Sequence, residues 1–149
     1  MEIADFLTPD RIILDQRPRD KSQLIAEIAR LFGRSMPAPP PDAIEAALLA
    51  REELGSTGLG GGFALPHARI EGLSDYLGMF VRLAKPIDFQ AIDMQPVRLV
   101  FTLLIPSRSA TPHVAALAAI SRRFRDADLV ARLMKAETQA IAYGFLTKR

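Results

Sequence analysis

Two side chains of the 149-residue chain, His67 and His113, are histidines, and the chain has no cysteine. A neutral imidazole is a nucleophile, and its charge near pH 7 responds to small changes in its surroundings. The lack of cysteine excludes disulfides, thiolate metal sites and thiol catalysis. A metal hydrolase built on the two histidines is a weak alternative, because a catalytic zinc usually has three protein ligands. The chemistry of this chain therefore centres on its imidazoles.

His67 follows Pro66 and a glycine-rich approach at residues 58–62. The proline restricts the local backbone, so the imidazole is expected to point in a set direction. The glycines allow the backbone of another molecule to come close. The alternative is a surface histidine at the end of a strand beside a flexible loop. The spacing alone does not decide between a reactive histidine and this one.

His113 is expected at the second position of a helix that Thr111 caps and Pro112 opens. The first N–H groups of a helix have no partner within it and form a ready anion site. His113 is also in phase with Leu117, Ile120 and Phe124, as a histidine packed in the core would be. The pattern alone favours the core histidine.

Residues 51–58 supply other groups suited to a phosphoryl anion. Arg51, near the end of a helix expected over residues 42–53, could hold phosphoryl oxygens with its planar fork, or could simply complement the helix dipole. Ser56, Thr57 and Gly58 could cradle phosphate. The segment lacks the Lys-Ser/Thr ending of a P-loop and the strand-then-helix setting of a dinucleotide site, so both of these are excluded.

The elements that must position these residues alternate between strand and helix, which indicates an α/β fold. Strands are expected at residues 11–14, 63–65, 77–83 and 99–105; the last is almost entirely apolar, as a strand covered on both faces should be. Helices are expected from Asp20, with Gln23 in a capping box, to a stop at Gly33, and over residues 42–53. Further helices are expected after Thr111, from Asp126 or Asp128, and over residues 137–145.

Composition limits the function classes. With 149 residues, 49% of them hydrophobic and 24% charged, one globular domain over residues 1–149 is expected. The net charge is only +2, and Arg122, Arg123 and Arg125 form the one basic cluster, so a DNA-binding regulator is disfavoured. There is no signal peptide at the N-terminus and no apolar run of spanning length. We expect a cytoplasmic protein without membrane insertion.

Residues 51–69 read REELGSTGLGGGFALPHAR, which closely resembles the signature of the enzyme IIA components of the bacterial phosphoenolpyruvate-dependent phosphotransferase system. The fructose/mannitol class, and within it the free-standing nitrogen-regulatory type, is the most similar. The resemblance continues through KPIDF at 85–89, QPV at 95–97 and residues 99–106 to Pro112-His113, and so covers essentially the whole chain. Leu65 and Ala68-Arg69 depart mildly from the usual isoleucine and glycine-lysine.

The resemblance implies a mixed sheet flanked by helices on both faces. It implies that His67 accepts a phosphoryl group, that His113 lines the same pocket, and that Arg51 assists. Ser56, Thr57, Gly58 and the first turn after Thr111 are then candidate phosphate-binding groups. The implied donor is a phosphohistidine on a small carrier protein of the HPr or NPr type, with no cofactor or metal. Leu59, Phe63 and Met79 are candidates for an apolar rim that meets this carrier.

Within the family, two roles are open. The nitrogen-regulatory type reports its phosphorylation state to targets such as potassium transport or sensor-kinase systems. A sugar-specific enzyme IIA instead passes phosphate to a fructose- or mannitol-type permease component. In either role the chain is a phosphotransferase component rather than a free-standing metabolic enzyme. A further alternative is a binding module that senses phosphate without chemistry.

Overall fold

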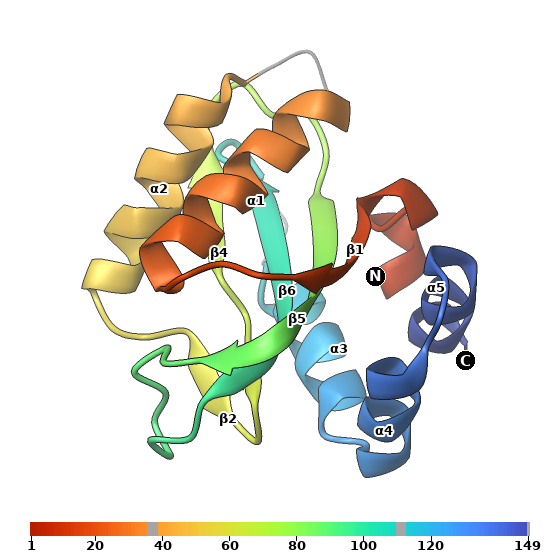
Figure 1. The fold of residues 1–149 in the computed structure, drawn as a ribbon. Coiled ribbons are helices and arrows are strands. Elements are labelled where there is room, and N and C mark those ends of the chain that lie inside the picture. Colours follow the sequence, from red (N-terminus) through yellow and green to blue (C-terminus); the bar gives the residue numbers. More distant parts are fainter. Residues whose placement is uncertain (36–38, 110–112, 149) are drawn as a thin grey trace.

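The computed structural model describes residues 1–35, 39–109 and 113–148. These residues form a six-stranded mixed sheet with α-helices on both faces (Figure 1), as expected. The elements run, in chain order, η1 (Ile3–Asp5), η2 (Pro9–Arg11), β1 (Ile12–Gln16), α1 (Lys21–Ser35), α2 (Pro41–Glu53), β2 (Gly58–Gly60), β3 (Phe63–Ala64), β4 (His67–Ile70), β5 (Leu77–Ile87), β6 (Val97–Pro106), α3 (Val114–Phe124), α4 (Ala127–Lys135) and α5 (Gln139–Thr147).

The sheet is built around β6. Its order is β1-β5-β6-β3-β2, and β4 also pairs with β6. The long β5–β6 pair is antiparallel, whereas β1 is parallel to β5, and β3 and β4 are parallel to β6. Because β3 and β4 follow one another along the same edge of β6, Phe63 lies opposite Leu99 and His67 lies opposite Leu103. The sheet therefore holds His67 in register with its central strand.

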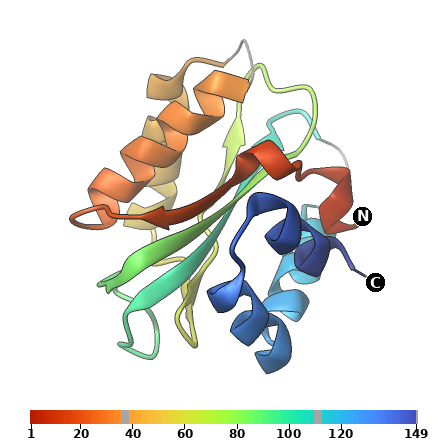
Figure 2. The same cartoon turned by 45° about the vertical axis from the view of Figure 1, so that its right-hand side comes forward.

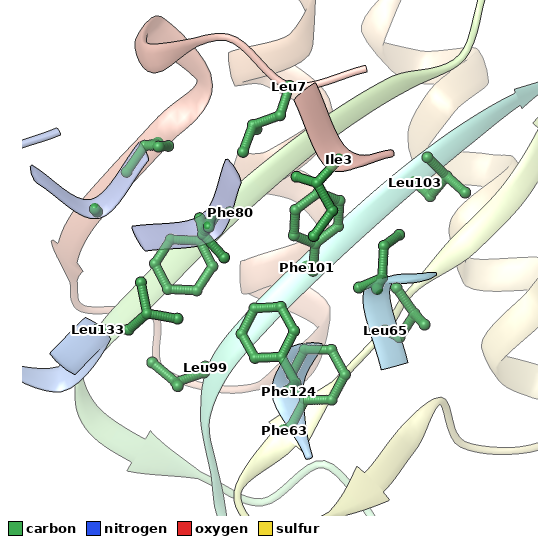
Figure 3. Close-up of a cluster of buried hydrophobic side chains, with 14 of the residues drawn as sticks. Ile3, Leu7, Phe63, Leu65, Phe80, Leu99, Phe101, Leu103, Phe124 and Leu133 are labelled. Atoms are coloured by element: carbon green, nitrogen blue, oxygen red, sulfur yellow. The ribbon is translucent and has the colours of Figure 1, made fainter. Parts of the chain in front are cut away.

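Successive side chains of β6 point alternately into two separate hydrophobic cores. Leu99, Phe101 and Leu103 point into a core that α3, α4 and α5 cover, and Val100 and Leu104 point into a core under α1 and α2. Figure 2 shows the two helix groups on opposite faces of the sheet. In the first core, drawn in Figure 3, Phe124 of α3 stacks on Phe63 with ring centroids 4.1 Å apart. Both faces are thus sealed, which explains the apolar run at residues 99–105.

Helix α1 begins as expected but ends later. Asp20 Oδ1 accepts a hydrogen bond from Gln23 N at 2.9 Å, so Asp20 caps the helix. The expected stop at Gly33 is wrong, because α1 continues to Ser35. The glycine has a packing reason instead: a Cβ at this position would lie 2.6 Å from Pro41 Cγ at the start of α2. Gly33 allows the two helices to approach closely.

Helix α3 begins at Val114, with His113 as the residue before it, so His113 does not occupy the expected second helical position. Thr111 and Pro112, the expected cap and first residue, lie outside the described residues. The helix buries Ala116, Ile120 and Phe124 against the sheet, whereas His113 is only half-buried. The core alternative for His113 is therefore wrong.

The other differences lie in the strands and in α5, which runs from Gln139 to Thr147 rather than over residues 137–145. β2 lies within the expected glycine loop, β4 was not expected, and β5 continues past residue 83 to Ile87. Strands as short as β2 and β4 form because they pair with a neighbouring strand, and the local sequence does not reveal this pairing. Asp126 caps α4, and Thr138 caps α5 by accepting from Ile141 N at 3.1 Å.

In the part of the chain that the structure describes, none of the helices has the length and apolarity that crossing a bilayer requires.

Candidate functional site

His67 is the first residue of β4, and its imidazole is held in one orientation. Its Nδ1 lies 2.8 Å from the Leu65 carbonyl oxygen. A carbonyl can only accept a hydrogen bond, so we assign the ring proton to Nδ1 and the free lone pair to Nε2. The side chain is half-buried. This hydrogen bond leaves Nε2 as the ring atom that can act as a nucleophile.

Arg69 brings His113 to the same face of β4 as His67. Side chains two residues apart on a strand share a face, and Ala68 and Ile70 point the other way into the core. Arg69 Nη2 lies 3.2 Å from His113 Nδ1. Because a guanidinium only donates, His113 Nδ1 accepts and its Nε2 carries the proton. The two imidazoles therefore lie on one side of the molecule, with one offering a lone pair and the other an N–H.

The electrostatic surroundings keep His67 neutral. Burial is the main cause that lowers the pKa of His67 below its usual value of 6.5, and the proximity of Arg51 and His113 lowers this pKa further. The hydrogen bond to the Leu65 carbonyl and the Glu52 carboxylate act in the opposite direction. A lowered pKa leaves the imidazole uncharged at neutral pH, which a nucleophile requires.

Arg51 lies in the last turn of α2, where its Nη1 donates to the Gly55 carbonyl at 2.8 Å. This contact and the negative end of the helix account for part of its orientation. The other N–H groups of its guanidinium take no part in this hydrogen bond. Arg51 thus holds the loop after α2, and its charge lowers the pKa of His67.

The loop residues expected to bind phosphate are tied to their neighbours. The Ser56 hydroxyl donates to the Phe89 carbonyl at 2.6 Å and accepts from Gly58 N at 3.0 Å. The buried Thr57 donates its N–H and its hydroxyl to the two oxygens of Glu52. These bonds fix the shape of the loop beside His67. The remaining candidate, Thr111, lies outside the described residues.

The expected apolar rim is largely wrong. Phe63 and Met79 are 6% and 1% exposed, because Phe63 stacks on Phe124 and Met79 packs under α1 and α2. Leu59 is half exposed, as expected. Ile92 and Met94 are far more exposed than Leu59.

The segment that carries Ile92 and Met94 is joined to the glycine loop. Ile92 N donates to Gly58 O at 3.3 Å, and Gly61 N donates to Asp93 Oδ2 at 2.9 Å. A cavity of about 470 Å³ lies against this segment and is lined by Asp88, Gln90, Ala91, Met94 and Pro96. An apolar surface of Leu59, Ile92 and Met94 therefore lies over the glycine loop.

Sequence reasoning missed two residues that the geometry brings to the site, Glu52 and Arg69. Arg69 stood out only as a departure from the family motif, and Glu52 was one of two adjacent glutamates, which nothing in the sequence distinguished. Among the described residues, no three His, Asp or Glu side chains are grouped as metal ligands. The arrangement is suited to holding an anion beside one nucleophilic imidazole.

Comparison with known proteins shows the family to which the chain belongs. The family model for the phosphoenolpyruvate-dependent sugar phosphotransferase system, EIIA 2, matches residues 5–149. A nitrogen regulatory protein of Bradyrhizobium diazoefficiens is 36% identical over 146 residues, which cover 98% of this chain and 95% of that protein. A fructose-specific EIIA component of Haloferax volcanii is 33% identical over 151 residues, covering 99% of this chain and 98% of that protein.

The fold agrees with a solved relative. The crystal structure of the nitrogen regulatory protein IIA-Ntr from Neisseria meningitidis matches with a TM-score of 0.91 at 33% identity, covering 97% of this chain and 99% of that one. The mixed sheet, the family model and the sequence relatives confirm the expected resemblance. The chain belongs to the EIIA 2 family of the phosphoenolpyruvate-dependent sugar phosphotransferase system.

Proposed function

We propose that this protein accepts a phosphoryl group on Nε2 of His67 from a phosphorylated carrier of the HPr or NPr type, and that its phosphorylation state then acts as a signal. A phosphocarrier-type role in the phosphotransferase system follows from the family. The acceptor atom and the donor are the proposal. The observation that carries it is the bond from His67 Nδ1 to the Leu65 carbonyl, which leaves Nε2 as the free nucleophile.

The transfer is an exchange between two imidazoles. The Nε2 lone pair of His67 forms a bond to phosphorus while the P–N bond of the donor breaks, and that electron pair returns to the donor ring. The His67 ring then carries positive charge. The Leu65 carbonyl stabilises this charge by accepting the hydrogen bond from Nδ1–H. Because the chemistry is nearly balanced, the protein contributes chiefly by placement in line and by charge stabilisation.

The phosphoryl oxygens need fixed donors in the transition state. His113 offers its Nε2–H, and Arg51 offers the guanidinium N–H groups that Gly55 does not occupy. Contact of Ser56, Thr57 or Gly58 with the phosphoryl group requires that their present hydrogen bonds be shared or exchanged.

Thr111 stays a candidate from the sequence. The carrier is proposed to dock on the apolar surface of Leu59, Ile92 and Met94, since desolvated apolar cores with polar rims are typical of protein interfaces.

We propose a regulatory role, in the cytoplasm where phosphoenolpyruvate is made. The high coverage by relatives named nitrogen regulatory proteins favours it, and targets such as potassium transport or sensor-kinase systems are then its partners. A second candidate is transfer onward to a sugar permease component. It is favoured by the 33% identity to a fructose-specific EIIA component over nearly the whole chain.

Incubation with phosphorylated carriers tests the proposal. We expect a mass gain of one phosphoryl group in the wild type and none in His67→Ala. Faster uptake from an NPr-type than from an HPr-type donor supports the regulatory role, whereas onward transfer to a purified fructose-type IIB protein supports the sugar role. Lack of any stable mass gain, together with reversible phosphate binding, would make the chain a sensing module instead.

A further inference from the structure

A nearly buried ion pair contacts the loop that follows α2, at Thr57. Glu52, at the end of α2, and Lys21, at the start of α1, have side chains 6% and 15% exposed, and Lys21 Nζ lies 2.6 Å from Glu52 Oε2. The same Oε2 accepts from Thr57 N at 3.2 Å, and Oε1 accepts from the Thr57 hydroxyl. A carboxylate removed from water costs free energy unless its oxygens are paired. Here both oxygens are paired, and the loop residue Thr57 supplies two of the three donors.

A continuous series of hydrogen bonds runs from this carboxylate to the reactive imidazole. Thr57 is held by Glu52, and its carbonyl accepts from Leu65 N at 2.9 Å. The Leu65 carbonyl in turn accepts from His67 Nδ1 at 2.8 Å. Glu52 is therefore linked to His67 through two intervening residues, in addition to the direct effect of its charge, which raises the pKa of the imidazole.

The other end of the ion pair anchors the opposite side of the loop. Lys21 Nζ also lies 3.3 Å from the Phe89 carbonyl and 4.5 Å from the centre of the Phe89 ring. The Phe89 carbonyl accepts the Ser56 hydroxyl as well. Residues 56 and 57 are thus fixed from two directions by one pair of opposite charges, which joins α1, α2 and the loop.

We propose that Glu52 is a positioning residue for phosphoryl acceptance: by clamping Thr57 it fixes the Leu65 carbonyl, and so keeps the proton of His67 on Nδ1 and the lone pair on Nε2. This proposal rests on the proposed function of His67. A histidine side chain free in water carries its ring proton mostly on Nε2. If the Leu65 carbonyl is displaced, the ring proton of His67 therefore shifts toward Nε2, and this atom no longer has a free lone pair for the attack. Loss of orientation adds to this, since small misplacements of a nucleophile slow transfer strongly.

The test reads the tautomer of His67 before any phosphate is added. Long-range ¹H–¹⁵N correlation spectra of the imidazole are recorded for the wild type, Glu52→Gln, and the matched control Glu53→Gln. The control removes a charge from the adjacent, exposed residue of the same helix. The wild type and Glu53→Gln are expected to show the Nδ1–H form. Glu52→Gln is expected to shift toward the Nε2–H form and to take up phosphate roughly 10- to 100-fold more slowly.

A wild-type tautomer and a wild-type rate in Glu52→Gln would overturn the proposal and leave Glu52 a purely structural residue. If that variant fails to fold, Thr57→Val and Thr57→Ser carry the same test: Val is expected to change the tautomer and Ser, which keeps the hydroxyl, to restore it; equal spectra for the two would overturn the proposal. Because the spectra need no carrier, a wild-type protein that takes up no phosphate refutes the proposed function separately.

Discussion

The two histidines are held in contrasting ways. His67 is the first residue of a sheet strand, with Nδ1 bonded to a carbonyl that a buried network positions. His113 lies just before α3, its side chain makes no capping bond to the helix, and its Nδ1 lies next to Arg69. The attacking atom of an in-line transfer must be placed closely, whereas a donor to equatorial oxygens tolerates more freedom. The contrast indicates that the sheet holds the proposed nucleophile, His67, more closely than the segment before α3 holds His113.

The largest effect is expected for His67→Ala, which removes the attacking atom. Phosphate uptake from a phosphorylated carrier should be abolished, as followed by intact mass or by gel shift in time. The fold should survive, because the side chain is only half-buried. Labelling of this variant at the wild-type rate would remove the distinction between the two histidines altogether.

His113→Ala should slow uptake roughly 100-fold without abolishing it, because one donor to the developing charge is lost while the nucleophile remains. Arg69→Gln is expected to lie between this variant and the wild type, since His113 keeps its Nε2 but loses the partner that fixes its tautomer. Single-turnover transfer rates measure both. An unchanged rate in His113→Ala would confine the site to His67 and its loop.

Arg51→Lys should slow uptake about tenfold, because a point charge on a flexible stem does not reproduce a planar fork. The change keeps the positive charge near His67, so the pKa of the imidazole should move little. Arg30→Lys on the exposed face of α1 is the matched control and should leave the rate unchanged. Equal rates for both variants would leave Arg51 with its helix-end and Gly55 contacts alone.

The pH dependence offers a smaller effect with a defined sign. Burial holds the pKa of His67 below 6.5, so the midpoint of the decline in uptake should lie below pH 6.5. In this lower window the unfolded chain binds a proton that the folded chain does not, so stability falls as the pH falls. An NMR titration of the His67 ring checks this; a pKa at or above 6.5 contradicts it.

A distant polar network should affect stability and leave the site alone. The buried Arg82 of β5 donates to the Leu133 and Ala136 carbonyls, at 2.9 and 2.6 Å, and pairs with the exposed Asp15. Arg82→Met should lower the free energy of unfolding by about 2–4 kcal/mol, since buried acceptors lose their donor. Asp15→Ala should cost about 0–1 kcal/mol. Denaturant unfolding measures both, and folded Arg82→Met should take up phosphate normally.

The same contrast separates what the sequence could predict from what it could not. The run at 99–105 and the Asp20 cap are local signals, and the structure confirms both. β4 has four residues and depends on β6 for pairing, so no local pattern indicated it. Whether Phe63 is exposed or buried depends on Phe124, which lies on another element and is far from Phe63 in the sequence.

The site follows the same rule. His67, His113 and Arg51 could be picked out from residue type and motif, and their catalytic roles remain predictions. Glu52 and Arg69 could not be picked out in this way. Arg69 contacts His113 across 44 positions of the chain, and Glu52 pairs with Lys21 on another helix.

The central claim concerns one atom, and the phosphorylated protein tests it most directly. After transfer from a phosphorylated carrier, long-range ¹H–¹⁵N and ³¹P spectra identify the nitrogen bonded to phosphorus. We predict a single phosphoramidate at Nε2 of His67, with the proton retained on Nδ1. Phosphorus on Nδ1 of His67, or on His113, would contradict the account.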